Sequence, residues 1–384
     1  MNTSKLDDLL QDAVDRGAVP NVTAVAADRN GVIYEGAAGP RVAGGDEPIT
    51  VNTRYRIMSM TKMVATAAAL QQVEKGLLDL DAPVESYRPE FADLQVLDGF
   101  DGETPRLRPP ASKATVKQLI THTAGLGYWF WNADLVRWEA ATGTPNVLSG
   151  SNVVFGAPLV ADPGTRLEYG INTDWLGKVI EAASGMTLDV AVKEGITAPL
   201  GMDSTSFAPS GSDREELVPV HLKGEDGWAA SEIELALKPE YYAGGHGLHS
   251  TPRDYLKFQR ALLGGGELDG VRILSAATVD AAFTNQVGDL DFPASIATAD
   301  PASSADFNAG PDHKWGYGLL LNTKDVPGRR RAGSGTWAGL LNTHFWVDRT
   351  TGVTGAVYTQ SLPFVVPEVF GVYTDFETAL YAAL

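Results

Sequence analysis

The most reactive arrangement in this 384-residue chain is a serine and a lysine three residues apart, Ser59 and Lys62. They open an apolar segment that is predicted to be a buried helix, so both side chains should lie on one face of it. Free N–H groups at a helix start stabilise an oxyanion. Burial lowers the pKa of a lysine, which could then take the serine proton. Ser-x-x-Lys occurs once here, but such a pair also arises by chance, so the motif alone leaves the role open.

Three other segments follow in a recognisable order. Residues 119–126 read Leu-Ile-Thr-His-Thr-Ala-Gly-Leu, residues 199–202 read Pro-Leu-Gly-Met, and residues 244–251 form a glycine-rich stretch before a predicted helix. With residues 59–62, this series resembles the serine β-lactamase and penicillin-binding protein superfamily over nearly the whole length. It is more specifically similar to the family VIII carboxylesterases, which are class C β-lactamase-like esterases.

The resemblance implies a second catalytic element, Tyr-x-Asn, for which Tyr169 is the candidate. Ile171 stands where β-lactamases have asparagine, a departure similar to the Tyr-Ser-Leu-like versions of esterase members. Tyr169 would act as a phenolate or as a hydrogen-bond relay between Ser59 and the leaving group, and would titrate together with Lys62. The alternative is an ordinary half-buried aromatic residue before a helix.

The third element of the superfamily, Lys-Thr-Gly, does not occur in this chain. The aligned residues are Trp337, Ala338 and Gly339, which are similar to the Trp-Gly-Gly of family VIII esterases. The resemblance implies an oxyanion hole made by the backbone N–H groups of Ser59 and Leu340. The small residues would let the strand approach the substrate closely. The alternative is a strand start with a packed tryptophan.

Four consecutive aromatic residues, Tyr128, Trp129, Phe130 and Trp131, follow the segment 119–126. They are candidates for the wall of a substrate pocket, or they pack the middle of the chain against the sheet. His122 is predicted to be structural and to hydrogen-bond the glycine turn three residues further on.

Composition excludes several classes of function. The formal net charge of −18 argues against nucleic-acid or anionic-membrane partners, and no cysteine is present to form disulfides or thiolate sites. There is no His-Glu-x-x-His, no Gly-x-Ser-x-Gly and no phosphate-binding loop. We therefore expect no metal, no cofactor, no membrane span, and a cytoplasmic location.

The element pattern predicts an α/β protein of the α+β type, with a central antiparallel sheet built from both ends of the chain and flanked by helices. Residues 1–79 and 224–384 would form this discontinuous domain, and residues 80–223 a mainly helical insertion. Strands are expected at 22–27, 32–34, 315–321, 339–347 and 353–358, a final helix at 367–384, and a surface loop at 295–308.

These features together predict a serine carboxylesterase that hydrolyses small, neutral, short-acyl esters through an acyl-enzyme on Ser59. Two alternatives stay open. One is an amide, peptide or β-lactam hydrolase on the same scaffold, and the other is a non-catalytic binding homologue. The oligomeric state is not predicted.

Overall fold

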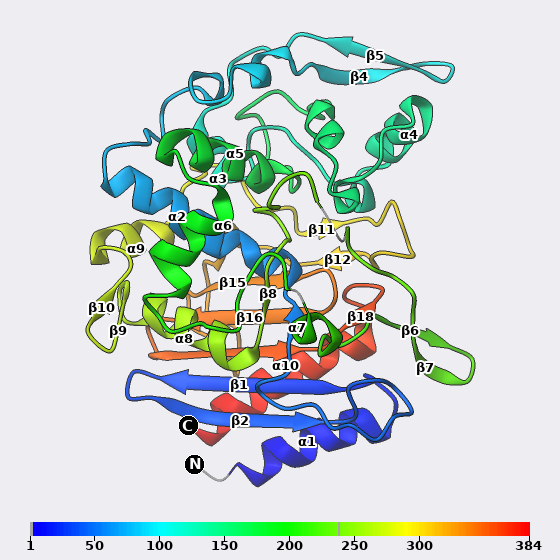
Figure 1. Ribbon diagram of the computed structural model, residues 1–384, viewed down its shortest axis with the longest axis vertical. Coiled ribbons are helices and arrows are strands. Elements are labelled where there is room, and N and C mark those ends of the chain that lie inside the picture. The colour runs from blue at the N-terminus through cyan, green and yellow to red at the C-terminus, as the bar shows by residue number, and fades with distance from the viewer. Residues whose placement is uncertain (1–2, 210, 237–238) are drawn as a thin grey trace.

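A computed structural model describes residues 3–209, 211–236 and 239–384 (Figure 1). Within them, seven strands form one antiparallel sheet in the order β13-β14-β15-β16-β17-β1-β2. The strands are β1 (Val22–Asp28), β2 (Val32–Ala38), β13 (His313–Trp315), β14 (Leu320–Asn322), β15 (Gly335–Gly339), β16 (Thr343–Asp348) and β17 (Val353–Tyr358). Strands from the two ends of the chain meet where β1 pairs with β17.

The strands follow from residue pattern and turn chemistry. β16 and β17 are buried along their whole length, whereas β2, at the sheet edge, mixes exposed and buried positions. The β1–β2 hairpin is closed by Asp28, whose carboxylate accepts hydrogen bonds from the backbone N–H groups of Asn30 and Gly31 at 2.7 and 3.0 Å. The predicted fold class is confirmed.

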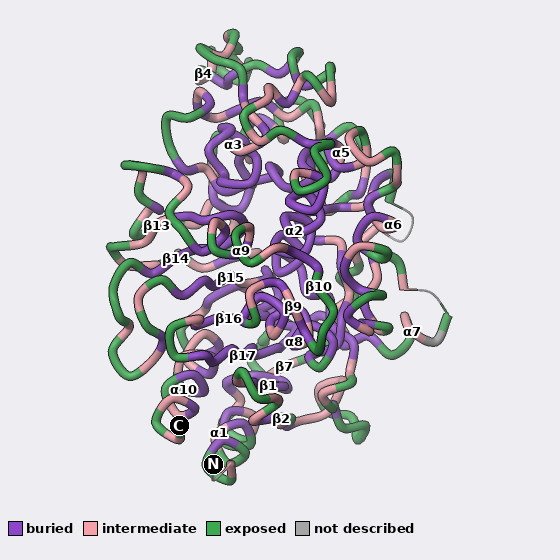
Figure 2. Tube along the Cα trace, turned by 90° about the vertical axis from the view of Figure 1, so that its left-hand side faces the viewer, coloured by how far each residue is buried: buried purple, intermediate pink, exposed green. Residues whose placement is uncertain are grey.

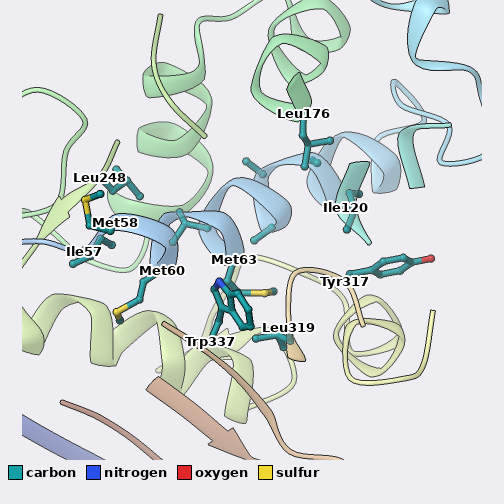
Figure 3. Close-up of a cluster of buried hydrophobic side chains, with 14 of the residues drawn as sticks. Ile57, Met58, Met60, Met63, Ile120, Leu176, Leu248, Tyr317, Leu319 and Trp337 are labelled. Carbon is teal, nitrogen blue, oxygen red and sulfur yellow. The ribbon is translucent and has the colours of Figure 1, made fainter. Parts of the chain in front are cut away.

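Helices cover both faces of the sheet (Figures 1 and 2). On one face, α1 (Ser4–Asp15) and α10 (Pro367–Ala383) enclose a core that includes Leu10, Trp346 and Phe376. On the other face lie α8 (Pro252–Leu263) and, further out, α2 (Thr61–Glu74). Nearly every residue of α2 is buried, and Figure 3 shows Met63 and Trp337 on one side of it and Leu176 on the other.

Two predicted strands are wrong in their bounds, because each contains a turn. Residues 315–321 form the end of β13, a turn and the start of β14, and Gly318 takes a φ of +75° in that turn. Residues 339–347 span the end of β15, a turn and most of β16, and Asn342 has a φ of +60° there. Glycine and asparagine are the residues that adopt this left-handed conformation most readily.

The middle of the chain is mainly helical and lies above the sheet in Figure 1. Its α-helices are α3 (Val116–Ile120), α4 (Ala133–Thr142), α5 (Asn172–Ser184), α6 (Leu188–Val192) and α7 (Ser212–Glu215). Another short helix, α9 (Ala276–Ala282), comes later in the chain, after α8. The short strands outside the main sheet are β3 (Tyr55–Arg56), β4 (Val96–Asp101), β5 (Thr104–Arg108), β6 (His221–Gly224), β7 (Gly227–Ala230), β8 (His249–Ser250), β9 (Glu267–Leu268), β10 (Val271–Arg272), β11 (Ser295–Ile296), β12 (Phe307–Asn308) and β18 (Ser361–Leu362). The predicted domain boundaries stay a prediction.

No helix in the described ranges has the length and apolar character needed to cross a membrane. The cytoplasmic location stays a prediction.

Candidate active site

Ser59 lies where the chain turns from β3 into α2. It occupies a single-turn 3-10 helix, Met58–Met60, directly before the first residue of α2. Met58 has a φ of +47°, a left-handed conformation that is costly for a residue with a side chain. Strained backbone of this kind collects at functional sites. Ser59 thus lies at a helix start, as predicted, and a 3-10 turn precedes the first residue of the α-helix.

The strand β15 comes against this turn at Gly339. A Cβ atom there would lie 2.4 Å from the Ile57 carbonyl oxygen and 3.0 Å from the Met58 Cβ. The Thr343 hydroxyl, from the next strand, donates to the same Ile57 carbonyl at 3.2 Å. The lack of a side chain at Gly339 therefore permits β15 to contact the backbone just before Ser59. The expected close approach of this strand to the substrate stays a prediction.

Replacing Gly339 by alanine should therefore destabilise the protein, because the added methyl group meets backbone that cannot yield. Overpacking of this kind costs about 1–3 kcal/mol. The check is the free energy of unfolding from denaturant titration, with Ala338→Gly in the same strand as the comparison. A Gly339→Ala protein as stable as the wild type would show that the two segments are not in contact.

The amine of Lys62 is buried at the centre of the site. Its Nζ lies 3.1 Å from Ser59 Oγ, 2.9 Å from the Tyr128 hydroxyl and 2.8 Å from the Gly245 carbonyl oxygen. The side chain is 1% exposed. Burial lowers the pKa of Lys62 to about 7, against an opposing effect of the Asp174 carboxylate. Near neutral pH, Lys62 therefore exists in both its charged and its neutral form.

Tyr169 lies just before α5 and also faces this centre. The Trp337 indole nitrogen donates to its hydroxyl at 2.8 Å, and Lys62 Nζ lies 4.8 Å from the centre of its ring. Burial raises the pKa of Tyr169 well above its usual value, and hydrogen bonding with Ser59 and Trp337 opposes that rise. At neutral pH, Tyr169 is therefore a neutral phenol, which favours the relay over the phenolate.

The aromatic residues 128–131 separate in the structure. Tyr128 points to Lys62, Phe130 stacks on Tyr128 with ring centres 5.1 Å apart, and Trp129 donates its indole N–H to Asp300 at 3.1 Å. Trp131, alone among these four described residues, lines a pocket beside Tyr169. Tyr128 and Trp129 instead line a separate and much smaller cavity.

The pocket beside Tyr169 has a volume of about 420 Å³ and is lined by residues 131–133, 166–169, 292–293 and 295–299, which include Tyr169 itself. The predicted surface loop 295–308 is at least partly exposed along most of its length, but its two ends pair as the short strands β11 and β12, and part of it lines this pocket. Hydrogen bonds from the Ala299 N–H to the Phe130 carbonyl, 2.8 Å, and from Trp131 to the Ser304 hydroxyl, 3.2 Å, fix it to the aromatic segment.

Contacts between the segment that precedes Tyr128 and the segment around Tyr169 hold the two tyrosines near each other. The Asn172 amide donates to the Leu126 carbonyl at 2.9 Å and contacts the His122 ring nitrogen at 3.0 Å. A Cβ on Gly170 would lie 2.2 Å from the Leu126 carbonyl oxygen, so only glycine allows this approach. His122 is structural, but its ring contacts Asn172 and Tyr169 and not the predicted glycine turn.

Comparison with known proteins identifies the family of this chain. The family profile described as Beta-lactamase matches residues 6–379. The chain belongs to the beta-lactamase family. Among its relatives is a lovastatin esterase of Penicillium rubens, 33% identical over 93% of this chain and 92% of that protein. A monacolin J acid methylbutanoyltransferase of Aspergillus terreus is 30% identical over 96% and 93%.

The structure of this beta-lactamase-family chain is also similar to a solved one. Simvastatin synthase (LovD) from Aspergillus terreus, unliganded, superposes with a TM-score of 0.87 at 29% identity, over 100% of this chain and 99% of that one. These relatives include an esterase and acyltransferases, so this beta-lactamase-family chain is a serine hydrolase or acyltransferase.

The sequence interpretation missed three residues at this centre: Tyr128 as a partner of Lys62, the Gly245 carbonyl, and Asp174. Gly245 lies in the glycine-rich stretch that carried part of the family resemblance, which is the one signal that pointed near it.

Proposed function

We propose that this chain is a carboxylesterase of the family VIII type, with Ser59 as nucleophile, Lys62 as general base and Tyr169 as the group that protonates the leaving alcohol. The observation that carries this proposal is the 3.1 Å contact between Lys62 Nζ and Ser59 Oγ inside a buried site. A base with a pKa of about 7 is matched to neutral pH.

Acylation follows from these positions. Lys62 takes the hydroxyl proton as Ser59 Oγ attacks the ester carbonyl carbon. The backbone N–H groups of Ser59 and Leu340 would hold the resulting oxyanion. The carbon–oxygen bond to the alcohol then breaks, and Tyr169 donates its proton to the alkoxide. Lys62 returns a proton to Tyr169, so the products of this half are the acyl-serine and the free alcohol.

Deacylation repeats the chemistry with water. The water gives up a proton through the Tyr169 hydroxyl to neutral Lys62 as its oxygen attacks the acyl carbon. The bond between the acyl carbon and Ser59 Oγ then breaks, and Lys62 returns the proton to that oxygen. The products are the carboxylic acid and the restored enzyme.

The position of the pocket divides the ester into two ends. Tyr169 protonates the leaving oxygen and also lines the 420 Å³ pocket, so the alcohol end should occupy that space. A volume in this range suits a substantial organic group. The acyl end, next to Ser59 and Leu340, would be short and uncharged. We therefore expect only the acyl group of the substrate to be small, and not the alcohol group.

Acyl transfer to an alcohol is the second candidate, favoured by the same pocket, because an alcohol bound beside Tyr169 would replace water as the attacking group. Turnover of 4-nitrophenyl butyrate should be measured with and without cyclohexanol, with both butyric acid and cyclohexyl butyrate quantified. Acid as the main product in both cases supports the esterase. Ester as the main product would make the chain an acyltransferase, and no turnover at all would contradict both.

The reaction should be lost on the acid side of neutrality. Lys62 must be neutral to accept the serine proton, and its pKa lies at about 7, so kcat/KM should fall about tenfold for each pH unit below that value. The measurement is kcat/KM for a short-chain nitrophenyl ester from pH 5 to 9. A rate that stays level down to pH 5.5 would exclude Lys62 as the base.

Neutral esters should be preferred over penicillins. In place of the superfamily lysine, Trp337 offers one N–H and no charge, and that N–H is already donated to Tyr169. A substrate carboxylate would lose water without gaining a cation. Trp337→Lys should move kcat/KM toward the penicillin, whereas Trp337→Phe, which removes only the N–H, should not. Wild-type turnover of a penicillin as fast as of the ester would contradict this explanation.

A further inference from the structure

Asp174 is a fully buried carboxylate that contacts two neighbours of Lys62. It lies in the first turn of α5, and its side chain is 0% exposed. One carboxylate oxygen accepts the Gly245 N–H at 2.9 Å, and the other lies 3.5 Å from the Tyr128 hydroxyl. Tyr128 and Gly245 also contact Lys62 Nζ, so two residues connect Asp174 to the lysine.

The chemistry of these groups fixes the direction of the hydrogen bonds. A carboxylate can only accept, so the Tyr128 hydroxyl gives its proton to Asp174 and presents its lone pairs to Lys62. The Gly245 carbonyl also only accepts. Lys62 must therefore donate twice, once to each. A neutral amine has two N–H bonds and one lone pair, and its remaining contact is Ser59 Oγ.

We propose that Asp174 is a positioning residue that, through Tyr128 and Gly245, turns the lone pair of Lys62 toward the Ser59 hydroxyl. The inference rests on the proposed function in taking Lys62 as the base. Without the carboxylate, the Tyr128 hydroxyl is free to donate to Lys62 and occupy its lone pair. The amine would then have no acceptor site left for the serine proton.

Electrostatics act in the same place. The Asp174 carboxylate raises the pKa of Lys62, against the larger effect of burial. The other titratable groups around this centre are Tyr128, Tyr169, Tyr241, His122 and His246. Burial raises the pKa of the tyrosines and lowers that of the histidines, so these five groups are neutral near pH 7. Asp174 thus supplies the negative charge among them.

The test combines the pKa of Lys62 with the reactivity of Ser59 in Asp174→Asn, which keeps the shape and the acceptor for Gly245 but removes the charge. Lysine labelled with ¹³C at Cε reports the titration of Lys62 by NMR, and Lys62→Met assigns its signal. We expect the pKa of Lys62 to fall by about one unit. We expect the rate of Ser59 modification by a fluorophosphonate, read by intact mass at pH 9, to fall at least tenfold.

Asp254→Asn is the matched control, because Asp254 is also a buried aspartate in the first turn of a helix, and accepts the Ser204 N–H at 2.7 Å. It should leave both readouts unchanged. A Lys62 pKa or a modification rate that is the same in Asp174→Asn as in the wild type would overturn the proposal.

Tyr128→Phe keeps the test decisive if Asp174→Asn does not fold, because it removes one of the two connections to Lys62 while Asp174 stays in place. It too should slow Ser59 modification at pH 9, and an unchanged rate would overturn the proposal. The NMR readout needs no substrate. A failure of the ester assay therefore counts against the proposed function, and an unchanged Lys62 pKa counts against the role of Asp174.

Discussion

Replacing Ser59 by alanine is expected to reduce ester hydrolysis by several powers of ten while the fold stays intact. The alanine removes the Oγ that lies 3.1 Å from Lys62 Nζ and that would carry the acyl group. Loss of a nucleophile commonly has an effect of this size on kcat. The measurement is kcat for a short-chain nitrophenyl ester, with circular dichroism and thermal unfolding as checks on the fold.

Ser250→Ala is the comparison for this result, because Ser250 is also a buried serine but hydrogen-bonds Thr205 and not Lys62. It should keep wild-type turnover. A Ser59→Ala protein with more than about a tenth of wild-type kcat would remove Ser59 from the mechanism.

Lys62 and Tyr169 are expected to be strongly non-additive, and each single change should cost most of the activity. They contact the same serine hydroxyl and move one proton between them in each half of the reaction. Groups that act as a unit lose their function when either one is removed. The measurement is a double-mutant cycle on kcat/KM with Lys62→Met, Tyr169→Phe and the double variant.

Multiplicative losses in this double-mutant cycle would contradict the prediction. If the two losses multiply, the residues act independently, and the shared proton relay is wrong. Tyr34→Phe, which changes a tyrosine hydroxyl that donates to Asp7 on the far side of the sheet, should combine multiplicatively with Lys62→Met and shows what independence looks like.

Local pattern was sufficient for the part of the site that lies within one turn of helix. Ser59 and Lys62 share a helix face, which their spacing in the sequence predicts. Tyr169 and Trp337 came from the family resemblance, and the structure brings their side chains within 2.8 Å of each other. Spacing alone could not have paired them, because 168 residues separate them.

The roles of Tyr128 and Asp174 could not be predicted from the sequence, for a different reason. Their roles depend on where segments far apart in the chain come together around Lys62. The residue type also misled, because Tyr128 stands in a run of aromatic residues that favours packing or a pocket wall. What distinguishes it from its neighbours is the 2.9 Å contact with Lys62, which exists only in the folded chain.

The fold was predictable in its strands and less so in its turns. β17 was placed at its correct residues, because a buried run and a clear hairpin loop bound it. The turn between β13 and β14 contains Gly316 and Gly318, but it was missed because apolar residues on both sides of the glycines suggested one continuous strand. The segment 295–308 has the composition of a surface loop, yet tertiary hydrogen bonds to residues 130 and 131 make it a wall of the pocket.

The most direct test of the central claim is the mass of the covalent intermediate. The enzyme is mixed with a short-chain nitrophenyl ester, quenched in acid within the first turnovers, and digested with trypsin, with a fluorophosphonate-treated sample in parallel. Cleavage after Arg56 and Lys62 releases the peptide 57–62, in which Ser59 is the one serine. The account predicts the acyl and phosphonyl masses on Ser59 of this peptide. Their appearance on another residue, while the ester is still hydrolysed, would contradict it.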